Sequence, residues 1–397
     1  MAINRRIMVK CVGAALAAPF VLTRPARAAE VTLRLHHALP ASDSLQSAFL
    51  IAWASGIREA SGERLDVQLL PAMQLGGAAR QLADQVRDGF VEMAWISIAS
   101  DPGRFARLEV FHLPFIASRR AVFTSQAVQD FAAAHPEQFP DLQLLFAAAG
   151  SGAAIHATKP IARLEDLKGM RLCPPSRLAA EALQTLGAIA VTVDAPLVRE
   201  ALAQKVLDGC AWPWAEAGAA KLEELVGFHT EIPPSLTLCA SASVLVMNKA
   251  AFEGLAPDLR KVLTDRSGQD GAALAGQHFD AVNTTAADLA RARGNIVGEI
   301  AAAEKVRWAE AAQPAVAAWI AGARTRGMDG EALVREARTL IARYDPPPPP
   351  AAPAQSQTVP ADPASAGLSP APPDLGLAGT TPGQLPTAPA QPPAPVP

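Results

Sequence analysis

The sequence predicts an α/β fold made of two successive α/β units, followed by a helical region and a tail. Three observations carry this prediction. Short apolar strands alternate with helices twice, once before and once after Ser151, which is typical of three-layer α/β domains with parallel sheets. The pattern becomes almost wholly helical after Asn248, and the composition changes abruptly at Asp345.

Residues 1–29 are predicted to be an export signal peptide. Arg5, Arg6 and Lys10 precede a mostly apolar run over residues 11–22, and Ala26-Arg27-Ala28 resembles a cleavage site. The run is too short to cross a membrane comfortably. Residues 4–10 also resemble a twin-arginine signal, so export by the Sec or the twin-arginine route stays open. We expect a periplasmic protein that is not embedded in a membrane.

The first α/β unit is predicted over residues 30–150, completed by residues 239–270. Residues 32–36 alternate apolar and polar side chains as a strand does, and the helix that follows ends at Gly62, because glycine tolerates the left-handed cap conformation. The other strands are predicted over 65–70, 93–98 and 244–248, and the helices over 44–61 and 78–88.

The second unit is predicted over residues 151–238, and the helices after it are expected to brace both units over residues 271–344. In the second unit we expect strands over 170–173, 190–193 and 210–212 and helices over 177–186 and 197–205. The late helices are predicted over 249–263, 268–293, 297–325 and 330–343. Pro314 should kink or break the third of them.

Residues 345–397 are predicted to form a disordered tail, partly of polyproline II type. Residues 346–397 contain 18 of the 35 prolines in the chain and almost no large apolar side chains. Such a segment cannot bury enough apolar surface to offset the entropy of ordering it.

The composition excludes several classes of function. The net charge is −3 with no basic block, which argues against a nucleic-acid partner. There is no nucleophile elbow, phosphate-binding glycine loop or zinc-ligand spacing, so we expect no enzyme, no cofactor and no metal. Signal cleavage leaves Cys173, Cys210 and Cys239. Either Cys173 and Cys210 form a disulfide, or all three are buried thiols.

Several segments occur in a characteristic order. They are PAMQLG at 71–76, RDG at 87–89, PGRFARLEVFHLPF at 102–115, LEDLKGMRLCPP at 164–175 and LDGCAWPW at 207–214. Together they resemble the periplasmic solute-binding proteins of tripartite ATP-independent (TRAP) transporters, of the dicarboxylate-receptor type, over about residues 30–344. The resemblance implies two α/β lobes with a hinge, long helices bracing both lobes, and a ligand enclosed in the cleft. It also implies delivery of that ligand to membrane permease subunits.

The resemblance also indicates three ligand-binding positions. Cys173 stands where the family carries the arginine that binds a substrate carboxylate, Ala153 stands about where some members have a second arginine, and Trp212 replaces an asparagine that often contacts ligand. All three differences make the cleft more apolar.

Six further residues are candidates for lining the cleft, each with a structural alternative. Arg177 could replace the missing charge or be a solvated surface arginine, and His156 could line the cleft or be structural. His36 and His37 end the first strand at the cleft edge, and one of the two is expected to be structural. Trp95 and Trp214 could stack on a ligand or belong to the core.

Two ligand classes fit these residues: a neutral, more apolar compound, or an organic acid rescued by Arg177, His156 or a bound cation. An arginine fork holds a carboxylate by two charge-assisted hydrogen bonds, which Cys173 cannot supply. The predicted function is an extracytoplasmic, non-catalytic solute receptor. The alternatives are a periplasmic ligand sensor for a signalling partner, and a hydrolase with Cys173 as nucleophile and His156 as base.

Overall fold

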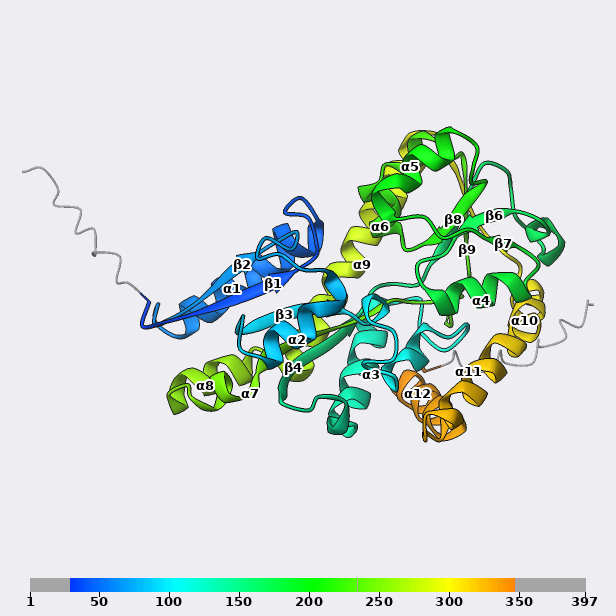
Figure 1. The fold of residues 1–397 in the computed structure, drawn as a ribbon. Coiled ribbons are helices and arrows are strands. Elements are labelled where there is room, and N and C mark those ends of the chain that lie inside the picture. The colour runs from blue at the N-terminus through cyan, green and yellow to red at the C-terminus, as the bar shows by residue number, and fades with distance from the viewer. Residues whose placement is uncertain (1–28, 234, 347–397) are drawn as a thin grey trace, which may run out of the picture. The chain divides into compact units, whose positions relative to one another are not determined.

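The computed structural model describes residues 29–346 except residue 234, and two β-sheets organise this part of the chain (Figure 1). The chain divides into two compact units, residues 1–348 and 349–397, and the second unit lies outside the described residues. The predicted signal peptide, except residue 29, and the predicted tail, except residues 345 and 346, also lie outside them. None of the described helices is both long and apolar enough to cross a membrane.

The first sheet has five strands in the order β2-β1-β3-β10-β4. Their bounds are β1 (Val31–His37), β2 (Leu65–Leu70), β3 (Met93–Ser97), β4 (Leu142–Ala149) and β10 (Ala242–Asn248). Helices cover both faces of this sheet, and we call the sheet with its helices the first lobe. The helices are α1 (Ile51–Ala60), α2 (Leu82–Arg87), α3 (Ala121–Ala134), α7 (Lys249–Glu253), α8 (Pro257–Asp265) and α12 (Gly330–Tyr344).

The second sheet has six strands in the order β11-β9-β5-β8-β6-β7. Their bounds are β5 (Ala154–Ala157), β6 (Arg171–Cys173), β7 (Ile189–Ala190), β8 (Gly209–Trp212), β9 (Phe228–Glu231) and β11 (Ile296–Glu299). This sheet and its helices form the second lobe. The helices are α4 (Arg177–Thr185), α5 (Ala195–Ala203), α6 (Trp214–Ala219) and α10 (Ala302–Ala311).

Both sheets are mixed, which corrects the prediction of parallel sheets. In the first sheet β1 is parallel to β2 and β3, whereas β10 is antiparallel to β3 and β4. In the second sheet β5 is antiparallel to β8 and β9. The chain leaves the first lobe after β4, enters the second at β5 and returns at β10. Repeated strand–helix units place their strands parallel to one another. The strands next to these crossings are not joined in that way, and they run antiparallel to their neighbours.

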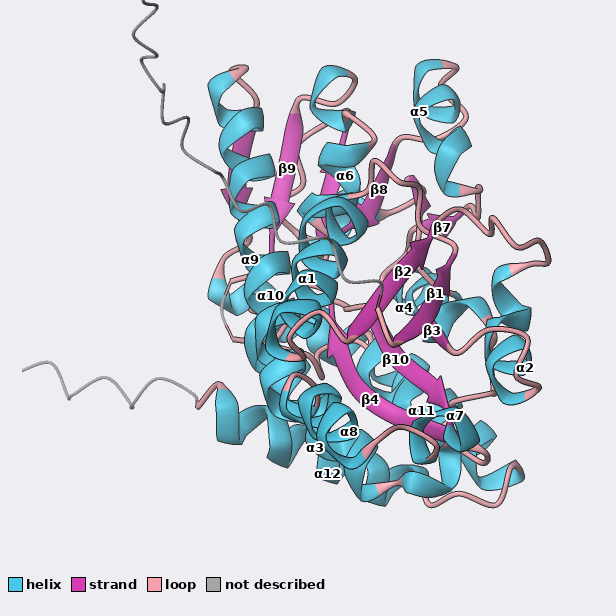
Figure 2. Ribbon diagram, turned by 90° about the vertical axis from the view of Figure 1, so that its left-hand side faces the viewer, coloured by secondary structure: helices cyan, strands magenta, loops and turns pink. Residues whose placement is uncertain are grey.

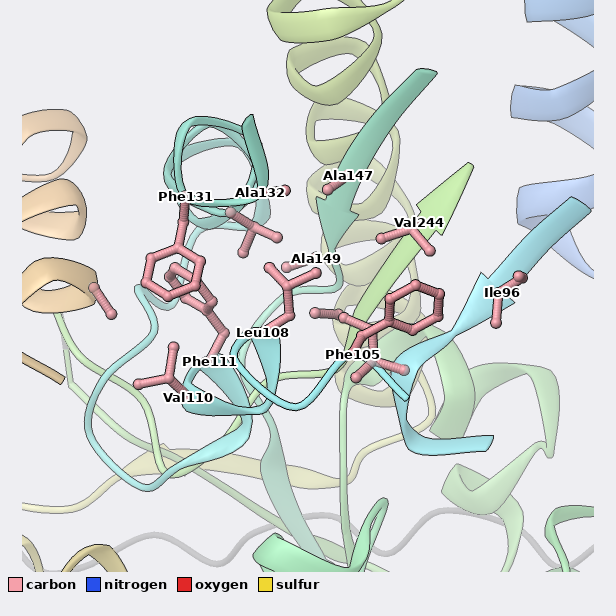
Figure 3. Close-up of a cluster of buried hydrophobic side chains, with 14 of the residues drawn as sticks. Ile96, Phe105, Leu108, Val110, Phe111, Phe131, Ala132, Ala147, Ala149 and Val244 are labelled. Carbon is pink, nitrogen blue, oxygen red and sulfur yellow. The ribbon is translucent and has the colours of Figure 1, made fainter. Parts of the chain in front are cut away.

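Alternating side chains give each sheet a core on both faces. In β10, Val244 and Val246 pack toward α2, α3 and α12, whereas Leu245 and Met247 pack toward α1 and α8. Figure 3 shows part of the first cluster, where the rings of Phe111 and Phe131 meet edge-on with centroids 5.2 Å apart. The second sheet alternates likewise, with Leu172 facing α4 and α10, and Cys173 facing α5.

A 25-residue helix, α9 (Gly268–Ala292), contacts both lobes (Figure 2). It packs on α3 and β4 of the first lobe and on α6 and β11 of the second. Two chain segments also cross between the lobes, around residues 150–153 and 235–241, and residues 113–119, which begin and end in the first lobe, run beside them. They are joined by backbone hydrogen bonds such as Phe115 N–H to Thr237 O (2.9 Å) and Ala153 N–H to Cys239 O (3.0 Å). The exact lobe boundaries stay a prediction.

Most predicted helices and strands are present, with a few corrections. Gly62 has φ +63° after α1, as the left-handed cap requires. The helix predicted over 249–263 is two helices, α7 and α8, because Gly254 ends the first and Pro257 begins the second. The predicted third late helix begins instead with strand β11 and then divides into α10 and α11 (Gln313–Thr325), with Pro314 in the first turn of α11. The strand predicted over 190–193 is the shorter β7.

Candidate functional site

A cavity of about 690 Å³ lies between the two lobes. The carboxyl ends of parallel strands form much of its wall, where α/β sheets commonly bind ligands. On the first-lobe side the wall consists of the loop after β1, the end of β3, the start of α2 and two serines of the β10 region. The residues are Ala38, Leu39, Pro40, Asp43, Ser44, Leu45, Ala79, Leu82, Trp95, Ser97, Ser100, Gly150, Ser151, Ser241 and Ser243.

The second lobe closes the other side of the cavity, and α9 forms its back. The second-lobe wall comes from the segment after β6, the start of α5 and the passage from β8 through α6. The residues are Pro175, Ala195, Pro196, Arg199, Trp212, Pro213, Ala215, Glu216, Ala219, Ala220 and Lys221, with Phe279 and Asn283 from α9. Asn283 also fixes α6, because its Oδ1 accepts a hydrogen bond from Ala215 N–H (2.7 Å).

The cavity combines aromatic surfaces with hydroxyl groups. Trp95, Trp212 and Phe279 supply rings from the first lobe, the second lobe and α9. Trp95 is held by an edge-on contact with Phe49, and its neighbour Ser97 stands opposite Ser243 in the β3–β10 register. The arrangement suits a small ligand with a flat apolar body and a few polar substituents.

Four charged side chains line the cavity: Asp43, Arg199, Glu216 and Lys221. Arg199 is already engaged, because it donates to Glu224 Oε2 (2.6 Å) and to the carbonyl oxygen of Lys221 (2.7 Å). Glu216 has no hydrogen bond or ion pair within the described residues. The side chain of Glu216 is exposed and lines the cavity.

Two of the nine residues predicted to bind ligand line this cavity, namely Trp95 and Trp212. Trp212 is nearly fully buried, and its indole N–H has no hydrogen-bond partner within the described part of the chain. Both tryptophans lie on strands that end at the cavity, so each contributes a ring edge to it while packing into the core behind.

Cys173 and Ala153 are not among the residues that line the cavity. Cys173 is fully buried, and its thiol lies 3.7 Å from the carbonyl oxygen of Val193. Burial raises the pKa of the Cys173 thiol. Cys173 and Cys210 are register partners on β6 and β8, yet all three described cysteines are free and buried, in line with the thiol alternative. Ala153 belongs to a buried crossing segment.

His156 also lies away from the cavity, in a buried pair with His229. His156 Nε2 lies 3.0 Å from the Trp212 carbonyl oxygen, which can only accept, so this nitrogen carries the proton of the neutral ring. His156 Nδ1 therefore accepts from His229 Nδ1–H (2.7 Å), and His229 Nε2 accepts from the Asn295 amide (3.1 Å). Burial lowers the pKa of His156 to about 3 and that of His229 to about 4.

The other four candidates have structural roles outside this cavity. His36 bonds Gln85 Oε1 through Nδ1 (2.8 Å), and His37 bonds Gln46 through Nε2. Arg177 forms an ion pair with Glu181 one turn along α4. Trp214 donates to Glu231 Oε1 (2.8 Å) and lines a second cavity of about 400 Å³ behind the crossing segments.

The hydrolase alternative requires His156 to lie within hydrogen-bond reach of the Cys173 thiol, and the structure does not place it there. Both nitrogens of His156 are occupied by His229 and the Trp212 carbonyl oxygen, and neither contacts the Cys173 thiol. A catalytic cysteine needs a base within hydrogen-bond reach. Among the described residues there is also no group of three or more His, Cys, Asp or Glu side chains placed to hold a metal ion.

The prediction missed Asp43, Glu216, Phe279, Asn283 and the serines. A signal for two of them was present in the sequence, since Asp43 and Glu216 follow strands that end at the cleft by a few residues. No sequence signal identifies Phe279 and Asn283, because their placement depends on how α9 crosses the two lobes.

The comparison with protein families decides the assignment. A model of the bacterial extracellular solute-binding protein family 7, DctP, matches residues 35–322. The chain belongs to this family. It is a solute receptor of the TRAP type, which confirms the resemblance seen in the sequence and the two-lobed fold. Membership indicates a periplasmic protein that binds small ligands, and the export route stays a prediction.

Solved structures of TRAP solute-binding proteins match nearly over their full length. A protein from a marine metagenome, specific for aromatic acid ligands and solved with metahydroxyphenylacetate, is 35% identical with a TM-score of 0.75, covering 79% of this chain and 99% of that one. A Rhodoferax ferrireducens protein with copurified benzoate is 34% identical with a TM-score of 0.74, covering 79% and 98%. A Bordetella bronchiseptica protein with bound mandelate is 27% identical with a TM-score of 0.70, covering 79% and 100%.

Proposed function

We propose that this protein captures a small aromatic ligand in the cavity between its lobes and delivers it to the membrane subunits of a TRAP transporter. The observation that carries the proposal is the ring set of Trp95, Trp212 and Phe279 around a cavity of about 690 Å³ in a protein of this family. Such a volume is within the range of pockets for small molecules. The aromatic ligands of the relatives at 34–35% identity support the same size and shape.

The groups that were expected to bind a ligand carboxylate in place of an arginine at position 173 do not line the cavity. Arg177 pairs with Glu181 outside the cavity, and His156 is buried as a neutral ring beside His229. The described residues offer no cluster for a bridging metal ion. The proposal therefore rests on the shape and apolar surface of the cavity.

Native mass spectrometry of the purified mature protein tests ligand capture directly. We expect a bound small molecule with an aromatic ring, which is released on denaturation and raises the melting temperature when added back. Replacing Phe279 by Ala should weaken rebinding by about 10-fold or more, since the ring of Phe279 lines the cavity and is only partly buried. Trp308→Ala is an unsuitable control because Trp308 is core, so Phe90→Ala, at an exposed site, serves instead.

Transport is tested separately by coexpressing the protein with TRAP membrane permease subunits. Uptake of the identified ligand should require both the receptor and the membrane subunits. Tight binding with no uptake would contradict delivery and favour the sensor alternative. A purified protein that carries and rebinds no aromatic compound would contradict the proposal as a whole.

A further inference from the structure

We propose that the cavity selects an aromatic ligand with a hydroxyl group on its ring, which binds to Ser97 and Ser243 of the first lobe. This inference deepens the proposed function and rests on it, because it assigns a polar substituent to the aromatic ligand. Both serines line the cavity and lie on neighbouring strands of the first sheet. Their register, their hydroxyl groups and the charges of the cavity wall point to a neutral hydroxyl group as their partner.

The two serines stand directly opposite each other on antiparallel strands. The register of β3 and β10 pairs Ser97 with Ser243 and Trp95 with Leu245. Residues paired in this way project from the same face of a sheet, with Cβ atoms roughly 4.5–5.5 Å apart. Since both serines line the cavity, their hydroxyl groups are near enough to each other to bind a single substituent of one ligand.

The sheet face that carries the serines changes from apolar to hydroxyl-bearing where the strands meet the cavity. Side chains two residues apart on a strand share a face. On β3 this face carries Met93 and Trp95 before Ser97, and on β10 it carries Leu245 beside Trp95. Met93, Trp95 and Leu245 belong to one buried cluster. Trp95 lines the cavity as Ser97 does, so an aromatic ring edge and the serine pair lie side by side.

The hydroxyl groups of Ser97 and Ser243 form no hydrogen bond with any other described residue. Two other serines of the cavity wall are engaged, because Ser100 Oγ donates to the carbonyl oxygen of Ser97 (2.7 Å) and Ser151 Oγ donates to Asp280 Oδ1 (3.2 Å). Ser97 and Ser243 are only half-buried. Each of their hydroxyl groups can donate one hydrogen bond and accept others, so the pair suits a ligand group that does both.

The charges of the cavity wall favour a neutral hydroxyl group over a carboxylate at the serine pair. Among the described residues, Asp43 is the one charged residue on the first-lobe side of the wall, and it is acidic. The cations of the wall, Arg199 and Lys221, belong to the second lobe. A carboxylate at the serines would therefore share its side of the cavity with Asp43 and with no cation, whereas a hydroxyl group carries no charge.

Isothermal titration of the ligand-free mature protein with size-matched probes tests this inference. The pairs are 3-hydroxybenzoate with 3-methylbenzoate, and 3-hydroxybenzamide with 3-methylbenzamide, together with the 4-substituted isomers. A hydroxyl group replaces a methyl group of similar size in each pair, so the difference in affinity reports hydrogen bonding at the substituent. We expect at least one hydroxylated isomer to bind about 10-fold more tightly than its methyl analogue, since the methyl group would leave the serines without a partner.

The double variant Ser97→Ala/Ser243→Ala should remove this preference, and each single variant should lose part of it. Affinity for the hydroxylated probes should fall by about 10-fold in the double variant. The methyl analogues should bind to it at least as tightly as to the wild type, which also shows that the variant folds. Ser55→Ala, at an exposed site on α1 outside the cavity, is the matched control and should bind every probe as the wild type does.

Methyl analogues that bind to the wild type as tightly as the hydroxylated probes would overturn this inference and leave the receptor function intact. A hydroxyl preference that survives in the double variant would do the same, because the serines would then not be its cause. If none of the probes binds and no aromatic compound copurifies with the protein, the proposed function fails as well.

Discussion

The buried imidazole pair of the second lobe shows how one carbonyl oxygen can determine the proton positions of several groups. Because the Trp212 carbonyl oxygen only accepts, His156 must donate from Nε2, which forces His229 to donate from Nδ1 and to accept from Asn295. Both hydrogen bonds of the imidazole pair, from His156 Nε2–H to Trp212 O and from His229 Nδ1–H to His156 Nδ1, are made when both rings are neutral. A proton added to either ring would place two N–H groups against each other.

We predict that this pair makes the protein sensitive to acid. In the unfolded chain each ring binds a proton near pH 6.5, whereas in the folded protein the rings stay neutral down to a pH of about 3 to 4. The unfolded state thus binds more protons below pH 6.5. The contribution of the pair to the free energy of unfolding is fully present above that pH. It falls by about 2 kcal/mol for each ring by about pH 5.

Urea unfolding as a function of pH measures this effect. The double variant His156→Leu/His229→Leu should be less stable at pH 7.5, because the Trp212 carbonyl oxygen loses the N–H group of His156. Its stability should nevertheless fall less steeply between pH 6.5 and pH 5. An unchanged slope in the double variant would show that other groups cause the acid sensitivity.

A second prediction concerns the three cysteines of the mature protein. Burial raises the pKa of Cys239 to about 12 and that of Cys210 well above its usual range, so few thiolates exist at neutral pH. Iodoacetamide should therefore leave the native protein unlabelled and modify three thiols after denaturation without reductant. A count of one modified thiol would reveal a disulfide, with Cys173 and Cys210 the neighbouring pair.

The sequence identified the aromatic part of the cavity better than its polar part. Trp95 and Trp212 were predictable because they lie near the ends of strands that point at the cleft. Cys173 also ends such a strand, but its side chain faces the core beside α5. Which face of a strand end belongs to the core and which to the cavity depends on the packing of helices from other parts of the chain.

Close helix packing determines how α9 fits against the first lobe. At Gly276 of α9, an added Cβ would lie 2.5 Å from Val122 Cα and 2.8 Å from the carbonyl oxygen of Ala121. Both are backbone atoms of α3, so they cannot move aside as a flexible side chain could. Glycine at this position therefore allows α9 to contact α3 closely.

We predict opposite effects for two glycine-to-alanine replacements in helices. Gly276→Ala should destabilise the protein by about 1–3 kcal/mol, since α9 and α3 must separate. Gly322→Ala in α11 has open space around the new methyl group and should be neutral or stabilise by up to about 1 kcal/mol through helix propensity. Urea denaturation compares the two. Equal effects would mean that the α3–α9 contact does not limit stability.

Strand β11 marks the limit of prediction from sequence at the level of elements. Ile296–Glu299 is only four residues long, contains Gly298 and stands between two long helices, so its apolar pattern fits a helix start equally well. Its identity as a strand comes from its partner β9, with which it pairs in parallel from Ile296 opposite Phe228 to Glu299 opposite Glu231. A pairing over such a sequence distance leaves no local signal.

The two lobes are connected by α9 and by the segments that cross between them. Because α9 packs on both sheets, neither lobe can unfold without exposing part of the surface that this helix covers. We predict one cooperative thermal transition, shifted upward as a unit when ligand binds. Scanning calorimetry with and without the identified ligand tests this. Two separate transitions, with one of them insensitive to ligand, would contradict the coupling.

The pairing of β11 with β9 has a consequence for recombining relatives of this protein. The second lobe looks like a contiguous insertion that could be grafted from one receptor to another to exchange half of the cleft. A graft of residues 151–238 alone would omit β11 and leave the outer edge of β9 with unpaired N–H and C=O groups. Such an edge is a template for self-association. A working chimera has to carry both stretches, the insertion and the distant strand that completes its sheet.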